Sequence, residues 1–223
     1  MTPAAMIFAA GFGTRMGELT KATPKPMLPL AGRPMVDHAI DHLKTAGISQ
    51  IVANTHYLPE KITPHLHSVG LKTIHEDTIL ETGGGLRAAL PSLGTNPVIT
   101  MNPDVVWSGL NPVSILLEAW QEEMVALLML VPSPEGCQTD DFNLEIGELR
   151  RSGPFRYTGL QMLRTDWLLE MRDPVFSLNL YWDHLIERGP VHGCVYPGTW
   201  QDVGTPDGLQ DAEKMLNDDF SSH

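Results

Sequence analysis

The residues of this sequence best suited to chemistry form a glycine-bearing loop with a lysine close behind it. The loop reads Gly11-Phe12-Gly13-Thr14-Arg15, and Lys25 stands ten positions after the arginine, between two prolines. Glycines let backbone N–H groups approach phosphate oxygens, an arginine offers a planar fork of donors for two oxygens, and a lysine supplies a point charge. The segment therefore predicts a cradle for a polyphosphate.

Two better-known phosphate loops do not fit this segment. A Walker loop needs Gly-Lys-Ser or Gly-Lys-Thr after four intervening residues, and no such sequence follows here. The dinucleotide fingerprint needs a glycine or alanine at the position that Met16 occupies. The cradle is therefore of a different kind.

Two aspartates far apart in the sequence are candidate metal ligands. Asp104 follows a predicted strand, and Asp202 lies between a predicted strand and a predicted helix. Ligands of open α/β sheets bind at the carboxyl ends of the strands, although aspartate is also a common turn or helix-entry residue there. Mg²⁺ takes one or two protein carboxylates and fills its octahedron with phosphate oxygens and water. With the cradle, the two aspartates predict a site for phosphoryl-type transfer.

A third segment, Leu80–Arg87, contains three successive glycines, Gly83 to Gly85. We expect them to precede a helix over Gly84–Leu90. Their bare backbone could lie against a flat nucleotide base, or the segment could be a flexible turn. We favour the contact with a base.

Composition limits the class of protein. The chain has 223 residues, 42% of them hydrophobic, which suffices for one sizeable core, so we expect a single domain. The formal net charge of −12 argues against a large basic surface for nucleic acid. In such an acidic protein, phosphate binding depends on a few local cations, here Arg15, Lys25 and a divalent ion.

The remaining features of the sequence do not favour a membrane segment, a disulfide or a histidine metal site. No apolar run reaches the roughly 18 residues of a membrane span, and the N-terminus lacks the layout of a secretory signal, so we expect a cytoplasmic protein with no membrane partner. Cys137 and Cys194 have no CxxC partner and are expected to be free thiols. His38 and His42 have a spacing that can bind a metal, but we favour surface or helix-packing roles for them.

The first half of the sequence alternates strand and helix patterns. A helix is expected over Pro34–Ala46, where Val36, Ile40 and Leu43 share one face and Gly47 follows as the stop. Such alternation predicts a parallel sheet with helices on both faces. The other expected elements are strands at Ala4–Ala9, Ile48–Thr55, Leu71–His75, Pro97–Met101 and Val125–Val131, and a helix from Pro112 to about Glu123 capped by Asn111.

After Pro132 the pattern loosens into a polar loop, Ser133–Asp141. Without an internal repeat or a low-complexity linker, the second half is expected to extend the same sheet and to carry part of the pocket. Its expected elements are strands at Phe142–Ile146, Arg156–Met162 and Val191–Tyr196 and helices at Asp166–Met171, Leu178–Arg188 and Thr205–Leu216.

Taken together, these motifs resemble the sugar-1-phosphate nucleotidyltransferases, the pyrophosphorylases. The opening matches the family signature Leu-Ala-Ala-Gly-x-Gly-Thr-Arg followed by Pro-Lys-Pro. The resemblance spans nearly the whole chain and is strongest to the short bacterial N-acetylmuramate 1-phosphate uridylyltransferases of cell-wall recycling. It is carried by Pro26–Met35, Leu80–Gly85, Asn102–Asp104 and Trp200–Thr205.

The resemblance implies a Rossmann-like nucleotidyltransferase fold, α/β, with a mixed, mostly parallel sheet flanked by helices. Residues 1–131 would bind the nucleotide, and residues 132–223 would bind the sugar and complete the metal site. The implied reaction joins an NTP, favoured as UTP, to a sugar 1-phosphate, favoured as N-acetylmuramate 1-phosphate, and releases pyrophosphate with Mg²⁺ as cofactor. A sugar phosphate is already a nucleophile near neutral pH, so the protein's tasks are alignment and electrostatic stabilisation.

The resemblance also assigns roles to residues. Catalytic roles fall to Arg15, Lys25, Asp104 and Asp202, and the two aspartates would also hold Mg²⁺. Asp141 and Gly159 would bind the sugar, although Asp141 could equally be a solvated loop acid. The nucleotide-binding residues would be Ala10, Gly11, Gly13, Thr14, Arg15, Glu81, Gly83, Gly84 and Asn102.

Two departures from the family pattern leave the acceptor open. Pro103 precedes Asp104 where a small residue is usual, and the loop Ser133–Asp141 lacks the histidine- and asparagine-bearing stretch of the muramate enzymes. The alternatives are mannose, glucose or N-acetylglucosamine 1-phosphate, or phosphocholine, which ranks last because no aromatic cluster is present for a quaternary ammonium. A non-catalytic sugar-nucleotide sensor is the alternative from another class. We expect a monomer or a homodimer.

Overall fold

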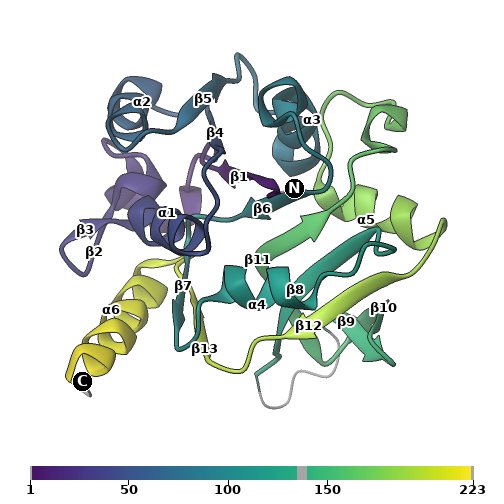
Figure 1. The fold of residues 1–223 in the computed structure, drawn as a ribbon. Coiled ribbons are helices and arrows are strands. Elements are labelled where there is room, and N and C mark those ends of the chain that lie inside the picture. The colour runs from purple at the N-terminus through teal and green to yellow at the C-terminus, as the bar shows by residue number, and fades with distance from the viewer. Residues whose placement is uncertain (1, 135–139, 222–223) are drawn as a thin grey trace.

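A mixed nine-stranded sheet lies at the centre of the molecule, and helices cover both of its faces (Figure 1). The structure, a computed structural model, describes residues 2–134 and 140–221. The strands of the sheet are β1 (Ala4–Phe8), β4 (Ile51–Thr55), β5 (Lys72–His75), β6 (Val98–Met101), β8 (Ala126–Pro132), β9 (Asp140–Glu145), β10 (Glu148–Gly153), β11 (Phe155–Leu163) and β12 (Val191–Val195).

The strand order is β5-β4-β1-β6-β11-β8-β12-β10-β9. The first four strands in this order are parallel, as are β8 and β12. β11 runs antiparallel between β6 and β8, and β10 runs antiparallel to β12 and β9. The expected mixed sheet is confirmed, with its parallel part concentrated in the first half of the chain. It is not mostly parallel as expected, because β9, β10 and β11 pair with their neighbours in antiparallel fashion. Because β11 lies between β6 and β8, strands from residues 1–131 and 132–223 interleave in one sheet.

The helices are α1 (Met35–Thr45), α2 (Pro59–Ser68), α3 (Glu81–Leu93), α4 (Pro112–Ala119), α5 (Leu178–Ile186) and α6 (Pro206–Ser221). Asn111 caps α4 as predicted, since its Oδ1 accepts hydrogen bonds from the N–H groups of Val113 and Ser114. The predicted helix at Asp166–Met171 is a single 3₁₀ turn, Leu168–Glu170. In the described part of the chain, no helix combines the length and apolar character needed to cross a membrane.

Side chains of β1 point alternately to the two faces of the sheet, and a hydrophobic core lies on each face. Ala5 and Ile7 belong to the core that α1, α2 and α4 cover. Ala4 and Met6 belong to the core beneath α3 and α5. A strand buried on both faces explains the continuous apolar run at the start of the sequence.

A third, smaller core joins segments that are far apart in the sequence. Met16 and Leu28 from the cradle pack with Val106 and Val203, and Ala212 of α6 contributes to the same cluster. Val106 belongs to β7 (Val105–Ser108), which pairs antiparallel with β13 (Thr199–Asp202) in a separate two-stranded ribbon. A second small ribbon pairs β2 (Pro29–Leu30) with β3 (Arg33–Pro34). The third core fixes the cradle relative to the β7–β13 ribbon.

Several elements were not predicted from the sequence. α2 contains Pro64 and buries only Ile62 and Leu66, so its helical pattern is weak. β10 is largely polar, and it pairs with β9 through a two-residue turn in which Ile146 and Gly147 both have positive φ. β7 and β13 are four-residue strands whose pairing depends on tertiary contacts.

The helix predicted over Gly84–Leu90 is α3, but it begins earlier, at Glu81, so all three successive glycines lie inside the helix and do not precede it. The N–H groups of Gly83 and Gly84 donate to the carbonyl oxygen of Phe176 at 2.8 and 3.1 Å. A Cβ at Gly83 would stand 2.3 Å from the Phe176 ring, and one at Gly84 would stand 2.4 Å from the carbonyl oxygen of Pro174. The glycines therefore let the segment before α5 pack directly on the first turns of α3.

Gly84→Ala is expected to destabilise the fold, because the added methyl group meets a backbone oxygen that cannot move alone. We expect the free energy of unfolding in urea to fall by about 1–3 kcal/mol. Gly189→Ala is the matched control, since a Cβ there meets nothing within 4 Å; it should change stability by less than about 0.5 kcal/mol. Equal stability of the two variants would contradict the close-packing role.

Candidate active site

A cavity of about 320 Å³ opens where β1, β4 and β6 end. The rule that ligands of α/β sheets bind at the carboxyl ends of strands locates it correctly. Its wall contains most of the residues expected to bind a nucleotide. The lining consists of Phe8, Ala10, Gly11, Gly13, Thr14, Arg15, Lys25, Pro26, Asn54, Glu76, Ile79, Glu81, Thr82, Asn102, Pro103, Asp104 and Gly204.

The cradle brings Lys25 against the glycine loop. Gly13 has a φ of +64°, and a Cβ built there would lie 2.8 Å from the Cβ of Lys25. The hydroxyl of Thr20 donates to the Gly13 carbonyl oxygen at 3.1 Å, which holds the loop from the other side. A larger residue at position 13 would therefore displace the lysine.

Lys25 forms a close ion pair with Asp104. The Nζ of Lys25 lies 2.5 Å from Oδ2 of Asp104, and the lysine is only 8% exposed. A buried ammonium needs a partner of opposite charge, and the carboxylate supplies it. An ammonium group has three N–H donors, so Lys25 keeps donors available for a phosphate in the cavity.

The β7–β13 ribbon brings the two aspartates together across almost one hundred residues of sequence. Asp202 stands opposite Val105 in the ribbon, and the N–H of Val203 donates to the carbonyl oxygen of Asp104 at 2.8 Å. This register makes the two carboxylates neighbours. Burial raises the pKa of Asp202, and the charge of Asp104 raises it further.

The donor set fits a magnesium ion that is shared with phosphates. In the described ranges, no group of three or more His, Cys, Asp or Glu side chains could form a metal cage from protein ligands alone. Two carboxylates with a mutual repulsion, as the pKa of Asp202 indicates, favour a cation between them. Mg²⁺ binds in this way, through one or two carboxylates together with substrate phosphate oxygens. Asp104 and Asp202 are the residues that would hold it.

Arg15 lies at the edge of the same centre. Its guanidinium nitrogen is 4.0 Å from Oδ2 of Asp202, and its side chain is 66% exposed. An exposed pair at this distance contributes little stability, so Arg15 is available to a ligand. A Cβ at Gly204 would stand 2.7 Å from the guanidinium and 2.8 Å from the Asp202 carboxylate. Gly204 thus permits the approach of the two charged groups.

A buried polar network beneath the cavity escaped the sequence analysis. Asn54 Oδ1 accepts from the N–H of Ala9 at 2.8 Å, and its Nδ2 donates to Oε1 of Glu76 at 2.7 Å. The second oxygen of Glu76 accepts from the N–H of Leu80 at 3.0 Å. Asn54 lies at the end of β4 and Glu76 directly follows β5, so the strand-end rule that selected Asp104 could have found both.

Glu81 and Asn102, both predicted to bind the nucleotide, line the cavity. Glu81 adopts a φ of +58°, which is costly for a residue with a side chain and is typical of binding sites. Gly83 and Gly84 are not part of the lining, and their N–H groups already bind Phe176.

The two residues predicted to bind the sugar have structural contacts instead. Gly159, with a φ of +90°, packs against Asn102, whose N–H donates to the Gly159 carbonyl oxygen at 2.8 Å. Asp141 Oδ2 accepts from the N–H of Tyr157 at 2.9 Å. Neither residue lines a cavity described here, so their contact with a sugar stays a prediction.

A second cavity, of about 620 Å³, lies on the other side of Asp202. Asp104 lines the first cavity and Asp202 the second, so the carboxylate pair stands between them. Two separate cavities thus adjoin the pair of carboxylates. The lining of the second cavity consists of Val131, Pro132, Pro134, Arg156, Gly198, Thr199, Trp200, Gln201, Asp202, Thr205, Asp207, Gly208 and Asp211.

The histidines and the described cysteine have the ordinary roles expected of them. His38 Nε2 contacts the carbonyl oxygen of Leu30 at 3.0 Å, and burial lowers the pKa of His42 to about 4, so this ring packs uncharged. Cys194 is a free thiol, and Cys137 lies outside the described residues.

Residues 5–139, which contain the cradle and Asp104, match the MobA-like NTP transferase domain. The chain belongs to this family. This chain is 34% identical to the N-acetylmuramate alpha-1-phosphate uridylyltransferase of Caulobacter vibrioides, over 95% of this chain and 96% of that protein. It is 32% identical to the enzyme of the same name from Neisseria meningitidis serogroup B, over 95% of this chain and 97% of that protein.

The fold of this NTP transferase is also found in a crystal structure of UDP-glucose pyrophosphorylase complexed with UDP-glucose. The two chains superpose with a TM-score of 0.83 at 15% sequence identity, over 98% of this chain and 99% of the other. The expected nucleotidyltransferase fold is therefore confirmed. Because the family match ends at residue 139, it covers the first cavity's cradle and Asp104 but not Asp202.

Asp202→Asn is expected to stabilise the metal-free protein at pH 7. The raised pKa means that folding disfavours the charged carboxylate, so the native carboxylate contributes stability at low pH and loses it as the pH rises through its folded pKa. The neutral amide avoids this loss. Urea unfolding should therefore give the variant a higher free energy of unfolding at pH 7, with a difference that shrinks as the pH approaches about 4.

Asp77→Asn serves as the control, because the side chain of Asp77 is fully exposed. It should change stability at pH 7 by less than about 0.5 kcal/mol. A destabilised Asp202→Asn variant would contradict the repulsion between the two carboxylates.

Proposed function

We propose that this NTP transferase transfers the uridylyl group of UTP to N-acetylmuramate 1-phosphate, forming UDP-N-acetylmuramate and pyrophosphate. The observation that carries the proposal is the pair of carboxylates, Asp104 and Asp202, which lies between two cavities. Asp104 also forms an ion pair with Lys25. The choice of substrates is supported by the two uridylyltransferases that match along nearly their whole length.

In the proposed reaction, a phosphate oxygen of the sugar 1-phosphate attacks the α-phosphorus of UTP. The bond from that phosphorus to the oxygen bridging toward the β-phosphate breaks, and pyrophosphate leaves with the electron pair. The nucleophile is already ionised, so no proton has to be removed by a side chain. The rate then depends on holding two anions in line and on offsetting their repulsion.

Lys25 and Arg15 carry the positive charge on the side of the first cavity. Lys25 is rigidly held by Asp104 and can keep donors on the phosphates as charge moves to the leaving group. Arg15 is exposed and can close on the triphosphate with two parallel hydrogen bonds. Gly11 and Gly13 line the same cavity.

Asp104 and Asp202 would hold Mg²⁺, which supplies electrostatic stabilisation of the phosphate charge when it is bound. The base would lie near Glu81, Thr82 and Asn102, which line the first cavity. The acceptor would occupy the second cavity. We place the reaction in the cytoplasm, where UTP is made, and in the reuse of cell-wall sugars.

A non-catalytic sugar-nucleotide sensor is the weaker reading. Holding two carboxylates together opposes the ionisation of Asp202, and a protein that only binds a product gains nothing from that arrangement. A metal-dependent transferase benefits from the paired carboxylates, because they attract the ion on which its reaction depends.

The proposal is tested by pyrophosphate release across a grid of nucleotides and acceptors. UTP, dTTP, CTP, GTP and ATP are each combined with the 1-phosphates of N-acetylmuramate, N-acetylglucosamine, glucose and mannose, with Mg²⁺ or with EDTA. We expect the highest kcat/KM for UTP with N-acetylmuramate 1-phosphate, and no release in EDTA.

If another pair of nucleotide and acceptor gives the highest kcat/KM, nucleotidyl transfer would be supported, but the proposed substrates would be replaced by that pair. If no pair releases pyrophosphate and sugar nucleotides still bind in calorimetry, the proposed enzymatic function would be refuted and a sensor would be favoured.

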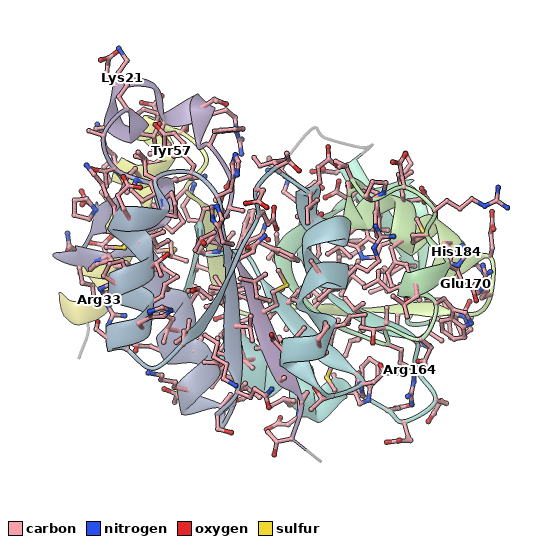
Figure 2. The ribbon with its side chains drawn as sticks, turned by 90° about the horizontal axis from the view of Figure 1, so that it is seen from above. Lys21, Arg33, Tyr57, Arg164, Glu170 and His184 are labelled. Atoms are coloured by element: carbon pink, nitrogen blue, oxygen red, sulfur yellow. The ribbon has the colours of Figure 1, made fainter. Side chains whose placement is uncertain are left out.

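Lys25→Met is expected to lower kcat/KM by at least about 100-fold, because it removes a fixed donor from the reacting phosphates and leaves Asp104 without its partner. Lys21→Met is the matched control. Lys21 pairs with Glu18, is 70% exposed, and points into solvent at the outer end of the molecule (Figure 2). Its kcat/KM should stay within about threefold of the wild type. Similar losses in both variants would contradict the role of Lys25.

A further inference from the structure

The second cavity has a charge pattern that the proposed reaction does not yet explain. Its described lining carries three carboxylates, Asp202, Asp207 and Asp211, and a single basic side chain, Arg156. In a chain of net charge −12, an anion is repelled from such a wall unless a cation faces it. Among the lining residues, Arg156 alone carries a positive charge to offset that repulsion.

Arg156 is held in a defined position on the sheet. It lies on β11 opposite Val131 of β8, and its Nε donates to Oδ2 of Asp140 at 2.9 Å. The hydroxyl of Ser133 donates to the same oxygen at 3.0 Å, which fixes the carboxylate. Asp140 is thus a support behind the arginine.

The free end of Arg156 is suited to a carboxylate. Its Nε is used by Asp140, whereas neither Nη nitrogen has a partner among the residues that the structure describes. The side chain is 38% exposed, so a ligand in the cavity can reach these nitrogens. Guanidinium N–H groups bind the two oxygens of a carboxylate in a planar, parallel arrangement.

Arg156 is also close to Asp202, one of the two aspartates that would hold Mg²⁺. Arg156 and Asp202 line the same cavity. The strand that carries Arg156 also holds the segment before Asp202, because the indole N–H of Trp200, two residues before Asp202, donates to the carbonyl oxygen of Thr158 at 3.0 Å. A sugar joined to a phosphate at the metal can therefore lie within reach of Arg156.

We propose that Arg156 selects the acceptor by binding the carboxylate of its lactyl ether. This inference rests on the proposed function. N-acetylmuramate is N-acetylglucosamine with lactic acid attached through an ether, so its 1-phosphate carries two anionic groups. The phosphate must reach the α-phosphorus, where Lys25 and Arg15 line the first cavity. Arg156, the basic side chain of the second cavity, is then available for the lactyl carboxylate.

The test compares two acceptors that differ only by the lactyl group. N-acetylmuramate 1-phosphate and N-acetylglucosamine 1-phosphate share the phosphate and the N-acetyl sugar. We expect Arg156→Gln to lower kcat/KM by about 10- to 100-fold with the first acceptor and by less than about threefold with the second. Arg156→Lys keeps the charge but loses the planar fork, and should lie between the wild type and Arg156→Gln.

Arg150→Gln is the matched control, because it removes the same charge from an exposed position on β10, beside Glu148 and outside the cavity. This variant should leave kcat/KM unchanged with both acceptors. A second readout needs no turnover: calorimetry should show that Arg156→Gln binds UDP-N-acetylmuramate about tenfold or more weakly and UDP-N-acetylglucosamine nearly as well as the wild type. Thermal unfolding of each variant reports whether the fold is retained.

The failure of this inference and the failure of the proposed function give different results. If the wild type uses N-acetylmuramate 1-phosphate and Arg156→Gln keeps the preference, only the inference is overturned. Equal losses with both acceptors would assign Arg156 to the shared phosphate, which also overturns it. A wild type that does not use N-acetylmuramate 1-phosphate would refute the proposed acceptor before any variant is compared, and the inference with it.

Discussion

The antiparallel pairing of β7 with β13 holds two carboxylates together in a place that only partly faces water. Asp104 and Asp202 repel each other there, and burial adds to the cost of ionising Asp202. Lys25 offsets part of this repulsion through its contact with Asp104. The remaining negative charge is what a divalent cation can neutralise, and the same cation can then bind phosphates. A centre that is electrostatically incomplete by itself is suited to assemble around a nucleotide.

The rest of the fold keeps this centre in register. The third core ties the cradle to the ribbon through Met16, Leu28 and Val203, with α6 packed over them. β11 provides a second tie, because its backbone accepts hydrogen bonds from Asn102 beside one aspartate and from Trp200 near the other. Both carboxylates are therefore positioned by backbone hydrogen bonds and close packing, which hold a site more rigidly than exposed ion pairs do.

The second half of the chain also braces the first turns of α3. Arg87 donates to the carbonyl oxygens of Met171 and Asp173 and lies over the ring of Phe176, whose own carbonyl oxygen receives two N–H groups of the helix. On the opposite side of these turns, the buried carboxylate of Glu76 is satisfied by hydrogen bonds. The turn that begins at Glu81 is thus fixed from both sides, which allows a residue with positive φ to persist at the cavity.

The sequence by itself determined the alternation of strands and helices, and it singled out the glycine loop with Lys25 and the two strand-end aspartates as candidate site residues, because these follow from local periodicity and from residue types that few other chemistries require. It did not indicate that the glycines of α3 let another segment pack closely on the helix, since a glycine chosen for close packing and one chosen to face a ligand look alike in sequence. Only the tertiary structure decided that Asp202 meets Asp104, that Asn54 and Glu76 form one network, and that Arg156 faces the second cavity. The physical reason is that pairing between distant strands is set by packing over the whole molecule, which no local pattern encodes.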